Sequence, residues 1–414
     1  MRLRGVRRLP GLITIPGMQA GMSRSFNQEK RIVALARPMK SPLLVLVTLA
    51  ACAHRAPPPP VAPIPPSEIV TSIFLLGDAG TAHHEPDPNL LELTRQASAS
   101  PRGSLIVFLG DNLYPNGLVA EGDPGRAEGE RRLEVQLEVA RKSQRRAIFL
   151  AGNHDWERWG QGGLGAIGRV SEFLRERVPG LSRQLPDSAC PGPVTLDVGT
   201  SIRMVFLDTQ WWLHSHDKPY GTTSRCAATT EDQVIEQLEA TLKSAGRRHV
   251  IVAAHHPLAS GGEHGGRYGL SRHLFPLRGW KRWLWIPLPV LGSIYPIARK
   301  LGITSQDLAN GRNEYMRAQF GKAFAANPPL LYAAGHDHNL QVFKGPYAKY
   351  SIVSGSGIVD HQEGVGWKKE TIYAEAAPGF MRVDVDRQGR VRLSVTKTEK
   401  TGSSEAMSIW LTEP

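Results

Sequence analysis

The chain has 414 residues, 41% of them hydrophobic, with 42 glycines and 31 prolines. This length suits one large domain or two ordinary ones, and the composition is compatible with a real hydrophobic core joined by many turns and long loops. The formal net charge of +12 would suit a nucleic-acid partner, but residues 1–51 hold nine Lys or Arg and one acid, which leaves 41 basic and 37 acidic residues beyond them. Because most of the basicity lies in that leader, we expect no nucleic-acid partner.

Residues 1–51 have the features of a leader that contains a signal peptide. Arg37 and Lys40 precede an apolar stretch, 42–51, which is too short to span a bilayer but has the length of a signal-peptide core. The stretch ends in Leu-Ala-Ala-Cys52, which resembles the lipobox of bacterial lipoproteins, whose cysteine is acylated. We therefore predict an extracytoplasmic lipoprotein that is anchored to a membrane through Cys52, in the periplasm or at the cell surface. The alternative is a plain secretory signal that ends in a lone cysteine.

The segment 52–67 is rich in proline and is expected to form an extended, semi-rigid tether. The folded domain is predicted over residues 68–400, with a C-terminal tail over 401–414. Cys190 and Cys226 are the only cysteines after Cys52. In an oxidising compartment they are able to form a disulfide, a question that the sequence leaves open.

Apolar, β-branched runs that end in polar residues predict buried strands in 68–80, 103–112, 145–156, 199–210, 247–258 and 327–339. Helical spacing predicts helices in 89–100, 128–143 and 231–244. Beyond residue 345 the segments 349–357, 379–389 and 390–399 are typical of strands joined by turns. Strands and helices that alternate in this way indicate an α/β domain whose site lies at the carboxyl edge of the sheet. The later strands indicate mixed sheets, two of them stacked.

Residues 271–302 interrupt this pattern as an insertion rich in tryptophan, proline and basic residues. Its helix breakers, and the lack of a 20-residue apolar core, argue against a membrane-spanning helix. Aromatic and basic residues together suit a membrane interface, so membrane contact is one interpretation. The plainer interpretation, which we favour here, is a loop insertion packed over the domain.

Polar residues that bind metals elsewhere stand at or just after the predicted strand ends: Asp78, Asp111, Tyr114, Asn153, His154, His255, His336 and His338. Taken singly, each has a simpler explanation, such as Asp111 capping a turn or His255 being an ordinary loop histidine. Taken together, two carboxylates, an amide oxygen and three imidazoles form a set able to hold two metal ions. Two cations about 3.5–4 Å apart are the arrangement used for in-line phosphoryl displacement.

Five motifs follow one another along the chain: GDAG (77–80), GDN (110–112), GNHD (152–155), AAHH (253–256) and GHDH (335–338). In this order they resemble the calcineurin-like metallophosphoesterase superfamily. The first motif lacks the usual histidine, and His83 and His84, which lie off the motif, are treated as loop residues. Tyr114 in GDNLY takes the place of that histidine, which resembles the purple acid phosphatase branch. The resemblance implies a mixed α/β fold, a four-layer α/β/β/α metallophosphoesterase sandwich.

The resemblance also implies a binuclear metal centre. One metal would be held by Asp78, Tyr114 and His338. The other would be held by Asn153, His255 and His336, with Asp111 as the bridge. A tyrosinate ligand favours Fe(III) at its subsite, beside a divalent Fe, Zn or Mn ion. Water activated by the two cations would attack phosphorus.

Three further residues have implied catalytic roles. His154 would orient the phosphate or protonate the leaving oxygen, and His264, in a Glu-His-Gly segment, is a weaker candidate for the same task. Asp155 would orient His154. Four other residues are more simply explained as solvated loop residues than as pocket residues: His214, His216, Arg267 and Arg272.

The sequence thus predicts an acid phosphatase-like enzyme that hydrolyses small phosphomonoesters. A phosphodiesterase that acts on nucleotides or phospholipid head groups is an alternative, because the Trp-rich insertion suits contact with lipids. A non-catalytic surface binding protein on the same fold is an alternative from another class. The complete ligand set argues against it, since such a set has little purely structural use.

Overall fold

The computed structural model describes residues 57–81, 87–279 and 283–412. The chain divides into two units, Met1–Ala53 and His54–Pro414, and every described residue belongs to the second. The predicted signal peptide and its Cys52 lie outside the described residues, as do His83 and His84. Lipid attachment at Cys52 therefore stays a prediction.

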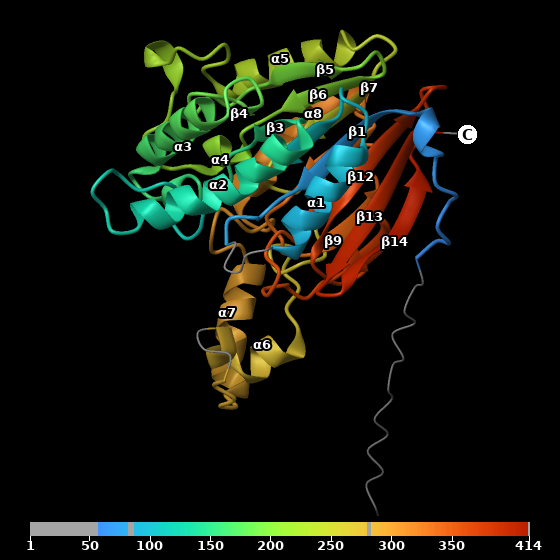
Figure 1. Cartoon of the computed structure of the whole chain (residues 1–414). Helices are drawn as coiled ribbons and strands as arrows, with labels where there is room; N and C mark the ends of the chain where they lie inside the picture. Colours follow the sequence, from blue (N-terminus) through green and yellow to red (C-terminus); the bar gives the residue numbers. More distant parts are fainter. Residues whose placement is uncertain (1–56, 82–86, 280–282, 413–414) are drawn as a thin grey trace, which may run out of the picture. The chain divides into compact units, whose positions relative to one another are not determined.

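The first of two seven-stranded sheets has the strand order β14-β13-β12-β1-β2-β3-β4 (Figure 1). Its strands are β1 (Ile69–Leu76), β2 (Leu105–Phe108), β3 (Arg146–Phe149), β4 (Ser182–Gln184), β12 (Gly379–Asp386), β13 (Val391–Glu399) and β14 (Gly402–Trp410). Strands β1 to β4 run parallel to one another, whereas β12, β13 and β14 add an antiparallel half. The helices on its outer face are α1 (Pro88–Ala99), α2 (Arg126–Ser143) and α3 (Gly163–Arg177).

The second sheet has the order β11-β9-β10-β8-β7-β6-β5. Its strands are β5 (Val194–Val198), β6 (Ile202–Phe206), β7 (His249–Ala253), β8 (Leu331–Ala334), β9 (Leu340–Lys344), β10 (Tyr350–Ser354) and β11 (Thr371–Glu375). The helices on its outer face are α4 (Thr209–Leu213), α5 (Glu231–Lys243) and α8 (Gly311–Ala326). Four short 3-10 helices are η1 (Pro66–Glu68), η2 (Glu157–Trp159), η3 (Gly221–Thr223) and η4 (Pro276–Gly279).

Alternating side chains along the strands create the layers, because successive residues of a strand point to opposite faces of its sheet. In β1, Leu75 packs into the core between the two sheets, whereas Phe74 packs against the outer helices. In β7, Ile251 packs into the core between the two sheets, and Val252 packs against the outer helices of the second sheet. The predicted four-layer α/β/β/α sandwich is therefore confirmed, and each strand and helix that the sequence predicts is present.

Both ends of the domain differ from the predicted boundaries. Residues 401–414 were expected as a tail, but most of them form β14, which pairs along the length of β13. At the other end, the predicted tether already contacts the domain. The Val61 carbonyl accepts hydrogen bonds from Arg392 Nη2 at 3.1 Å and from Ser408 Oγ at 3.2 Å. The folded domain is thus longer at both ends, because backbone pairing and hydrogen bonding hold segments that have little apolar pattern of their own.

The interpretation of residues 271–302 as a loop packed over the domain is wrong. This region contains α6 (Leu270–Leu274), η4 and α7 (Pro289–Lys300), and Figure 1 shows α6 and α7 packed beside each other and projecting from the sheets. In α7 the side chains of Val290 and Leu291 are 79% and 62% exposed. Within the described ranges, no helix is both long enough and apolar enough to cross a bilayer.

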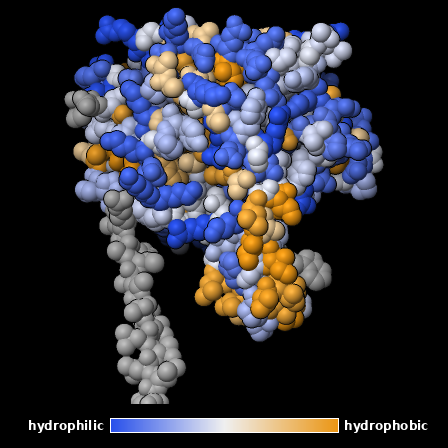
Figure 2. Space-filling model, turned by 180° about the vertical axis from the view of Figure 1, so that it is seen from behind, coloured by the Kyte–Doolittle hydropathy of each residue, from blue (hydrophilic) through white to orange (hydrophobic). Residues whose placement is uncertain are grey.

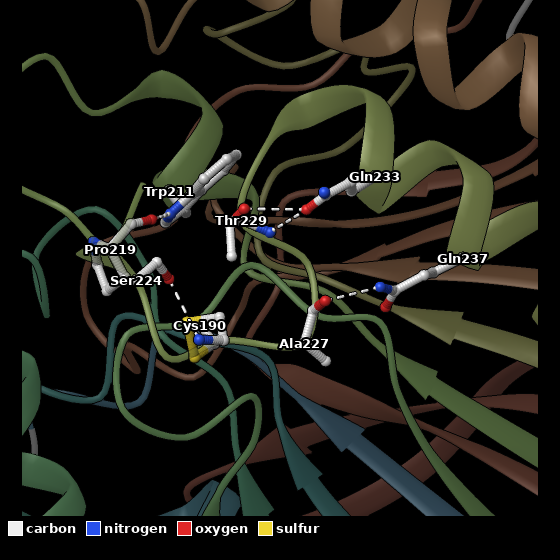
Figure 3. The surroundings of a disulfide bond; sticks show 9 residues. Cys190, Trp211, Pro219, Ser224, Ala227, Thr229, Gln233 and Gln237 are labelled. Atoms are coloured by element: carbon white, nitrogen blue, oxygen red, sulfur yellow. Dashed lines mark hydrogen bonds between the residues drawn. A yellow bond between two sulfur atoms is a disulfide. The ribbon is translucent and has the colours of Figure 1, made fainter. Parts of the chain in front are cut away.

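A disulfide joins Cys190 to Cys226 (Figure 3). It links the loop that follows β4 to the loop that precedes α5, and hydrogen bonds hold the second loop on both sides of the bridge. Trp211 Nε1 donates to the Pro219 carbonyl at 2.8 Å, and Gln237 Nε2 donates to the Ala227 carbonyl at 2.9 Å. A structural disulfide favours an oxidising, extracytoplasmic compartment.

Replacing both cysteines, in Cys190→Ser/Cys226→Ser, should lower the free energy of unfolding. The bridge spans a sequence separation of 36 residues, and its loss restores conformational entropy to the unfolded chain worth about 3–4 kcal/mol. Urea denaturation measures the change. A reductant should bring the wild-type protein to the stability of the variant and leave the variant unchanged, whereas equal stability of the two oxidised proteins would contradict the prediction.

Candidate metal centre

The predicted ligands meet at the carboxyl ends of strands from both sheets. Asp78 follows β1, Asp111 follows β2 and Asn153 follows β3, while His255 follows β7 and His336 follows β8. In open α/β sheets, binding sites form outside the carboxyl ends of parallel strands. Because the two sheets pack face to face, this edge brings polar residues from distant parts of the chain into one cluster.

Three of these residues adopt a left-handed backbone conformation. The φ angles are 61° at Asp78, 54° at Asp111 and 74° at His336. Residues other than glycine rarely occupy this region, and they do so where the surrounding structure holds them. Here Asp78 Oδ2 accepts a hydrogen bond from the His336 backbone N–H at 2.8 Å, and Asp111 Oδ1 accepts one from the His154 backbone N–H at 2.8 Å. Each of these bonds holds a carboxylate against the backbone that follows another strand, β8 for Asp78 and β3 for Asp111.

Two motif glycines are explained by the close approach of these carboxylates. A Cβ atom on Gly152 would lie 2.2 Å from Asp111 Oδ1, and one on Gly335 would lie 2.6 Å from Asp78 Oδ2. Both distances are far below van der Waals contact. The absence of a side chain at the glycine of GNHD and at the glycine of GHDH therefore gives the two carboxylates the space that they occupy.

Asn153, His255 and His336 form a first triad of possible ligand atoms. Asn153 Oδ1 lies 3.1 Å from His255 Nε2 and 3.0 Å from His336 Nδ1, and the two imidazole nitrogens are 3.2 Å apart. Atoms that each lie about 2.1 Å from one ion at right angles are separated by about 3 Å. The spacing of this triad therefore fits a common cation.

The protons of the two imidazoles point away from the centre of this triad. His255 Nδ1 lies 2.8 Å from the Leu109 carbonyl, and His336 Nε2 lies 3.2 Å from the Gln306 carbonyl. Since a carbonyl only accepts, both of these nitrogens carry hydrogen, and a neutral imidazole then presents a lone pair at its other nitrogen. Three lone pairs, one of them from the Asn153 amide oxygen, converge at one point, an arrangement that a cation stabilises.

Electrostatics also indicate that the site needs positive charge. Burial lowers the pKa of His255, but the Asp111 carboxylate, whose Oδ1 lies 3.5 Å from Nε2, outweighs burial and raises that pKa to about 9. A buried carboxylate requires a partner of opposite charge. A proton on His255 supplies that charge without a metal, and a bound cation would supply it in place of the proton.

Asp78, Tyr114 and His338 form a second triad. The Tyr114 hydroxyl donates to Asp78 Oδ1 at 3.0 Å and lies 3.1 Å from His338 Nε2, and Asp78 Oδ1 lies 3.5 Å from the same nitrogen. Burial and the charges of Asp111 and Asp78 raise the pKa of the Tyr114 hydroxyl. Only a cation bound beside the phenol would reverse this effect and favour phenolate near neutral pH.

Asp111 lies beside both triads. Atoms of Asp78, Asp111 and His255 all fall within 4.8 Å of one another, although Asp78 belongs to one triad and His255 to the other. The donor set therefore fits two neighbouring cations that share one carboxylate. Its members, which the structure brings together as the sequence predicts, are Asp78, Asp111, Tyr114, Asn153, His255, His336 and His338.

Two neighbouring groups are better explained as supports of the ligands. His256 is close to His255 and His336, but its nitrogens contact Thr209 Oγ1 at 2.8 Å and Gln306 Oε1 at 2.7 Å. Glu363 Oε1 lies 4.0 Å from His338 Nδ1, the ring nitrogen on the side away from the triad. This distance is too long for a hydrogen bond, but the backbone N–H of Glu363 donates to the His338 carbonyl at 2.9 Å and so holds the two segments together. No motif marks Glu363, so the sequence offers no signal for it.

The prediction that Asp155 orients His154 is wrong. The Asp155 carboxylate accepts hydrogen bonds from the backbone N–H of Gly152 at 2.8 Å and from the backbone and side chain of Asn112 at 3.1 Å. His154 instead donates its Nδ1–H to the Pro115 carbonyl at 2.6 Å. Asp155 therefore ties the GNHD loop to the GDN loop, and the His154 ring keeps Nε2 for the pocket.

A pocket of about 450 Å³ opens over the ligand cluster, and its polar lining includes Asp111, Asn153, His154, His264, Arg299 and His338. The His264 ring packs against the His336 ring at a tilt, with centroids 3.8 Å apart, which places it at the cluster as the sequence predicts. Arg299 comes from α7 and Gln306 from the segment after it, and neither belongs to a motif. The four residues assigned to loops, His214, His216, Arg267 and Arg272, do not line this pocket.

Comparisons with known proteins agree with this architecture. Over 180 residues the chain is 28% identical to purple acid phosphatase 17 of Arabidopsis thaliana, a match that covers 42% of this chain and 47% of that protein. The chain thus spans about half the length of this relative. Among solved structures, GAP50, described as the anchor in the inner membrane complex of Plasmodium, has a TM-score of 0.50 and 16% identity, with 81% of this chain and 88% of that chain covered.

A second structure, the purple acid phosphatase PPD1 from seeds of yellow lupin (Lupinus luteus), has a TM-score of 0.49 and 16% identity and covers 84% of this chain and 55% of its own. At 16% identity, GAP50 shares the fold alone. The match to a family is more informative, because residues 71–285 match the calcineurin-like phosphoesterases. This range is more than half of the chain and includes the strand ends that carry Asp78, Asp111, Asn153 and His255. The protein therefore belongs to the calcineurin-like phosphoesterase family.

Proposed function

We propose that the protein is a binuclear metal-dependent phosphatase, similar to acid phosphatases, that hydrolyses small phosphomonoesters. The observation that carries this proposal is the pair of ligand triads with interatomic distances of 3.0 to 3.5 Å, joined by the Asp111 carboxylate. Bound cations would lower the pKa of a coordinated water and neutralise the charge on the phosphate oxygens. The chain's own part is to hold the ligands and to bind and orient the substrate.

His154 and His264 are assigned to the substrate. With Nδ1–H held by the Pro115 carbonyl, His154 presents Nε2 in the pocket 4.0 Å from Asp111 Oδ2, within reach of a phosphate oxygen or a leaving group. His264 Nδ1 lies 3.0 Å from Arg299 Nη2, so the two side chains form one group in the wall of the same pocket. Arg299 Nη2 also lies 2.6 Å from Asp307 Oδ1, so the guanidinium is already paired with a carboxylate. We therefore assign to Arg299 the positioning of His264, and to His264 the contact with the phosphate.

The subsites would differ in metal. The hard phenolate oxygen of Tyr114, beside the carboxylate of Asp78, favours Fe(III) at that subsite, and the Asn153 subsite suits a divalent Fe, Zn or Mn ion. As to location, the lipobox at Cys52 and the Cys190–Cys226 disulfide support an extracytoplasmic lipoprotein anchored to a membrane.

A phosphodiesterase activity is the second candidate. One observation favours it: the pocket wall carries the side chains of Tyr295 and Ile303, which would contact an apolar ester group better than water. A non-catalytic binding protein of the same fold is disfavoured, because every ligand position is filled with a metal-binding side chain.

Metal analysis and a pair of substrates test the proposal. Purified protein should hold about two metal ions per chain and should hydrolyse p-nitrophenyl phosphate at least about 10-fold more efficiently than bis(p-nitrophenyl) phosphate. Removal of the metals by a chelator should abolish activity, and their return should restore it. The reverse substrate preference would favour the diesterase. Less than one ion per chain, with neither ester hydrolysed, would overturn the assignment as an enzyme.

A further inference from the structure

The projection that contains α6 and α7 carries most of the exposed apolar side chains of the described residues. Of the sixteen exposed large hydrophobic residues, eleven lie in this projection, between residues 270 and 303. They are Leu270, Trp283, Trp285, Ile286, Val290, Leu291, Ile294, Tyr295, Ile297, Leu301 and Ile303. Figure 2 shows them as an apolar surface on the projecting part of the molecule, whereas the face of the sheet domain in this view is mainly hydrophilic. Contiguous apolar surface of this kind marks an interaction site.

The projection holds its own shape. Leu288 N donates to the Leu274 carbonyl at 2.8 Å, and Phe275 packs edge-on against Trp285 with centroids 5.2 Å apart. Gly292 permits close contact between the helices, since a Cβ atom there would lie 2.2 Å from the His273 carbonyl oxygen. The apolar side chains are therefore presented by a packed helical pair.

The charge of the projection has a single sign. Residues 271–302 include six Lys or Arg and no Asp or Glu, although Arg272 and Arg299 are paired with Glu263 and Asp307 outside this range. Arg278 lies over the Trp285 ring, 3.7 Å from its centroid, so that cation and apolar surface are adjacent. Tryptophan, aliphatic and basic side chains in one helical element are the composition that inserts into the interface of a bilayer with anionic lipids. If the same surface of a second copy of this chain docked here, two positively charged surfaces would face and repel each other.

The base of the projection is hydrogen-bonded to residues beside the ligand cluster. Arg299, near the end of α7, donates from Nε to both carboxylate oxygens of Asp307 at 2.8 and 2.7 Å and lies 3.0 Å from His264. Tyr295, on the same helix, lines the pocket beside Arg299. The apolar surface and the pocket mouth are thus parts of one element.

We propose that the described part of this projection, residues 270–279 and 283–303, docks onto a membrane that contains anionic lipids. The exposed apolar side chains enter the interface, and Arg278 and Lys300 contact lipid phosphates. Docking places the pocket mouth beside the membrane surface, whatever ester the site hydrolyses. The proposal rests on shape, exposure and charge, and it is independent of the metal chemistry.

A local probe tests this docking in the full chain. Cys52→Ser removes the only cysteine outside the disulfide, so that Leu291→Cys can be labelled alone with an environment-sensitive fluorophore. On phosphatidylcholine vesicles that contain phosphatidylglycerol, the label at position 291 should shift to the blue and become protected from an aqueous quencher. The matched control is the label at Leu91→Cys, an exposed leucine of α1, which should stay accessible on the same vesicles. The local readout is needed because a leader that binds the vesicle would also bring the chain to it.

A second variant tests whether the exposed apolar side chains cause the fluorescence shift at position 291. Val290→Ser/Ile294→Ser should abolish the shift at position 291, and an unchanged thermal unfolding transition shows that the variant is folded. A label at position 291 that stays accessible on bound vesicles would overturn the proposal. So would protection that appears without lipid and depends on protein concentration, because a second copy would then cover the surface. Equal shifts with and without phosphatidylglycerol would overturn the assignment of anionic lipid.

Discussion

Asp111→Asn should reduce the hydrolysis of a phosphomonoester by on the order of 10³-fold or more, because the loss of one charge weakens both metal subsites at once. Asp111 is 2% exposed and lies beside atoms of both triads, so neither water nor another carboxylate of the cluster can replace its charge. The amide keeps the shape of the side chain and removes the anion. The measurements are kcat/KM and the number of metal ions retained after dialysis, and both should fall.

The matched control for this variant is Asp384→Asn. Asp384 is also buried, and its Oδ1 accepts hydrogen bonds from Ser72 Oγ at 2.6 Å and Arg382 Nε at 2.8 Å, in β12 and away from the pocket. Its substitution should cost stability and leave metal content and activity per folded molecule unchanged. Full activity or two retained metals in Asp111→Asn would refute the bridging role.

The strands of the sandwich were predictable because their signal is local. The apolar run 250–254 forms most of β7 and is followed by two histidines, and all residues of β7 except His249 are buried. The order of the five motifs then indicated which strand ends share one edge. The glycines of those motifs have a physical meaning that the structure supplies, since Gly152 and Gly335 leave space for carboxylates from other strands.

Elements that depend on tertiary contacts were not predicted. Helix α3 contains Gly163, Gly165 and Gly168, residues that weaken a helical pattern, and it is held by the burial of side chains such as Ile167 and Val170. Strand β14 has a polar first half, and only its pairing with β13 reveals it as a strand.

The same distinction applies to the site. Its ligands come from motifs, whereas Arg299 and Glu363 reach it from segments without a motif. The error at Asp155 came from proximity in sequence, because its carboxylate binds the backbone of the neighbouring loop, while the ring of the adjacent His154 is held by Pro115. The projection could be recognised by composition, but its exposure could not.

Tyr114→Phe should remove the visible charge-transfer band of the iron-loaded, oxidised protein and weaken iron binding by at least about 10-fold. The Tyr114 oxygen is the only phenol in contact with Asp78 and His338 among the described residues, and phenylalanine keeps the ring but supplies no ligand. The matched control is Tyr332→Phe, which removes another buried hydroxyl, one that donates to the His256 carbonyl at 2.8 Å. This control should keep the band, because the Tyr332 oxygen is bonded to a backbone carbonyl and belongs to neither triad. An iron-loaded wild-type protein without the band, or a Tyr114→Phe protein that keeps it, would show that the phenol does not bind the metal. Either result would also remove the reason for placing Fe(III) at this subsite.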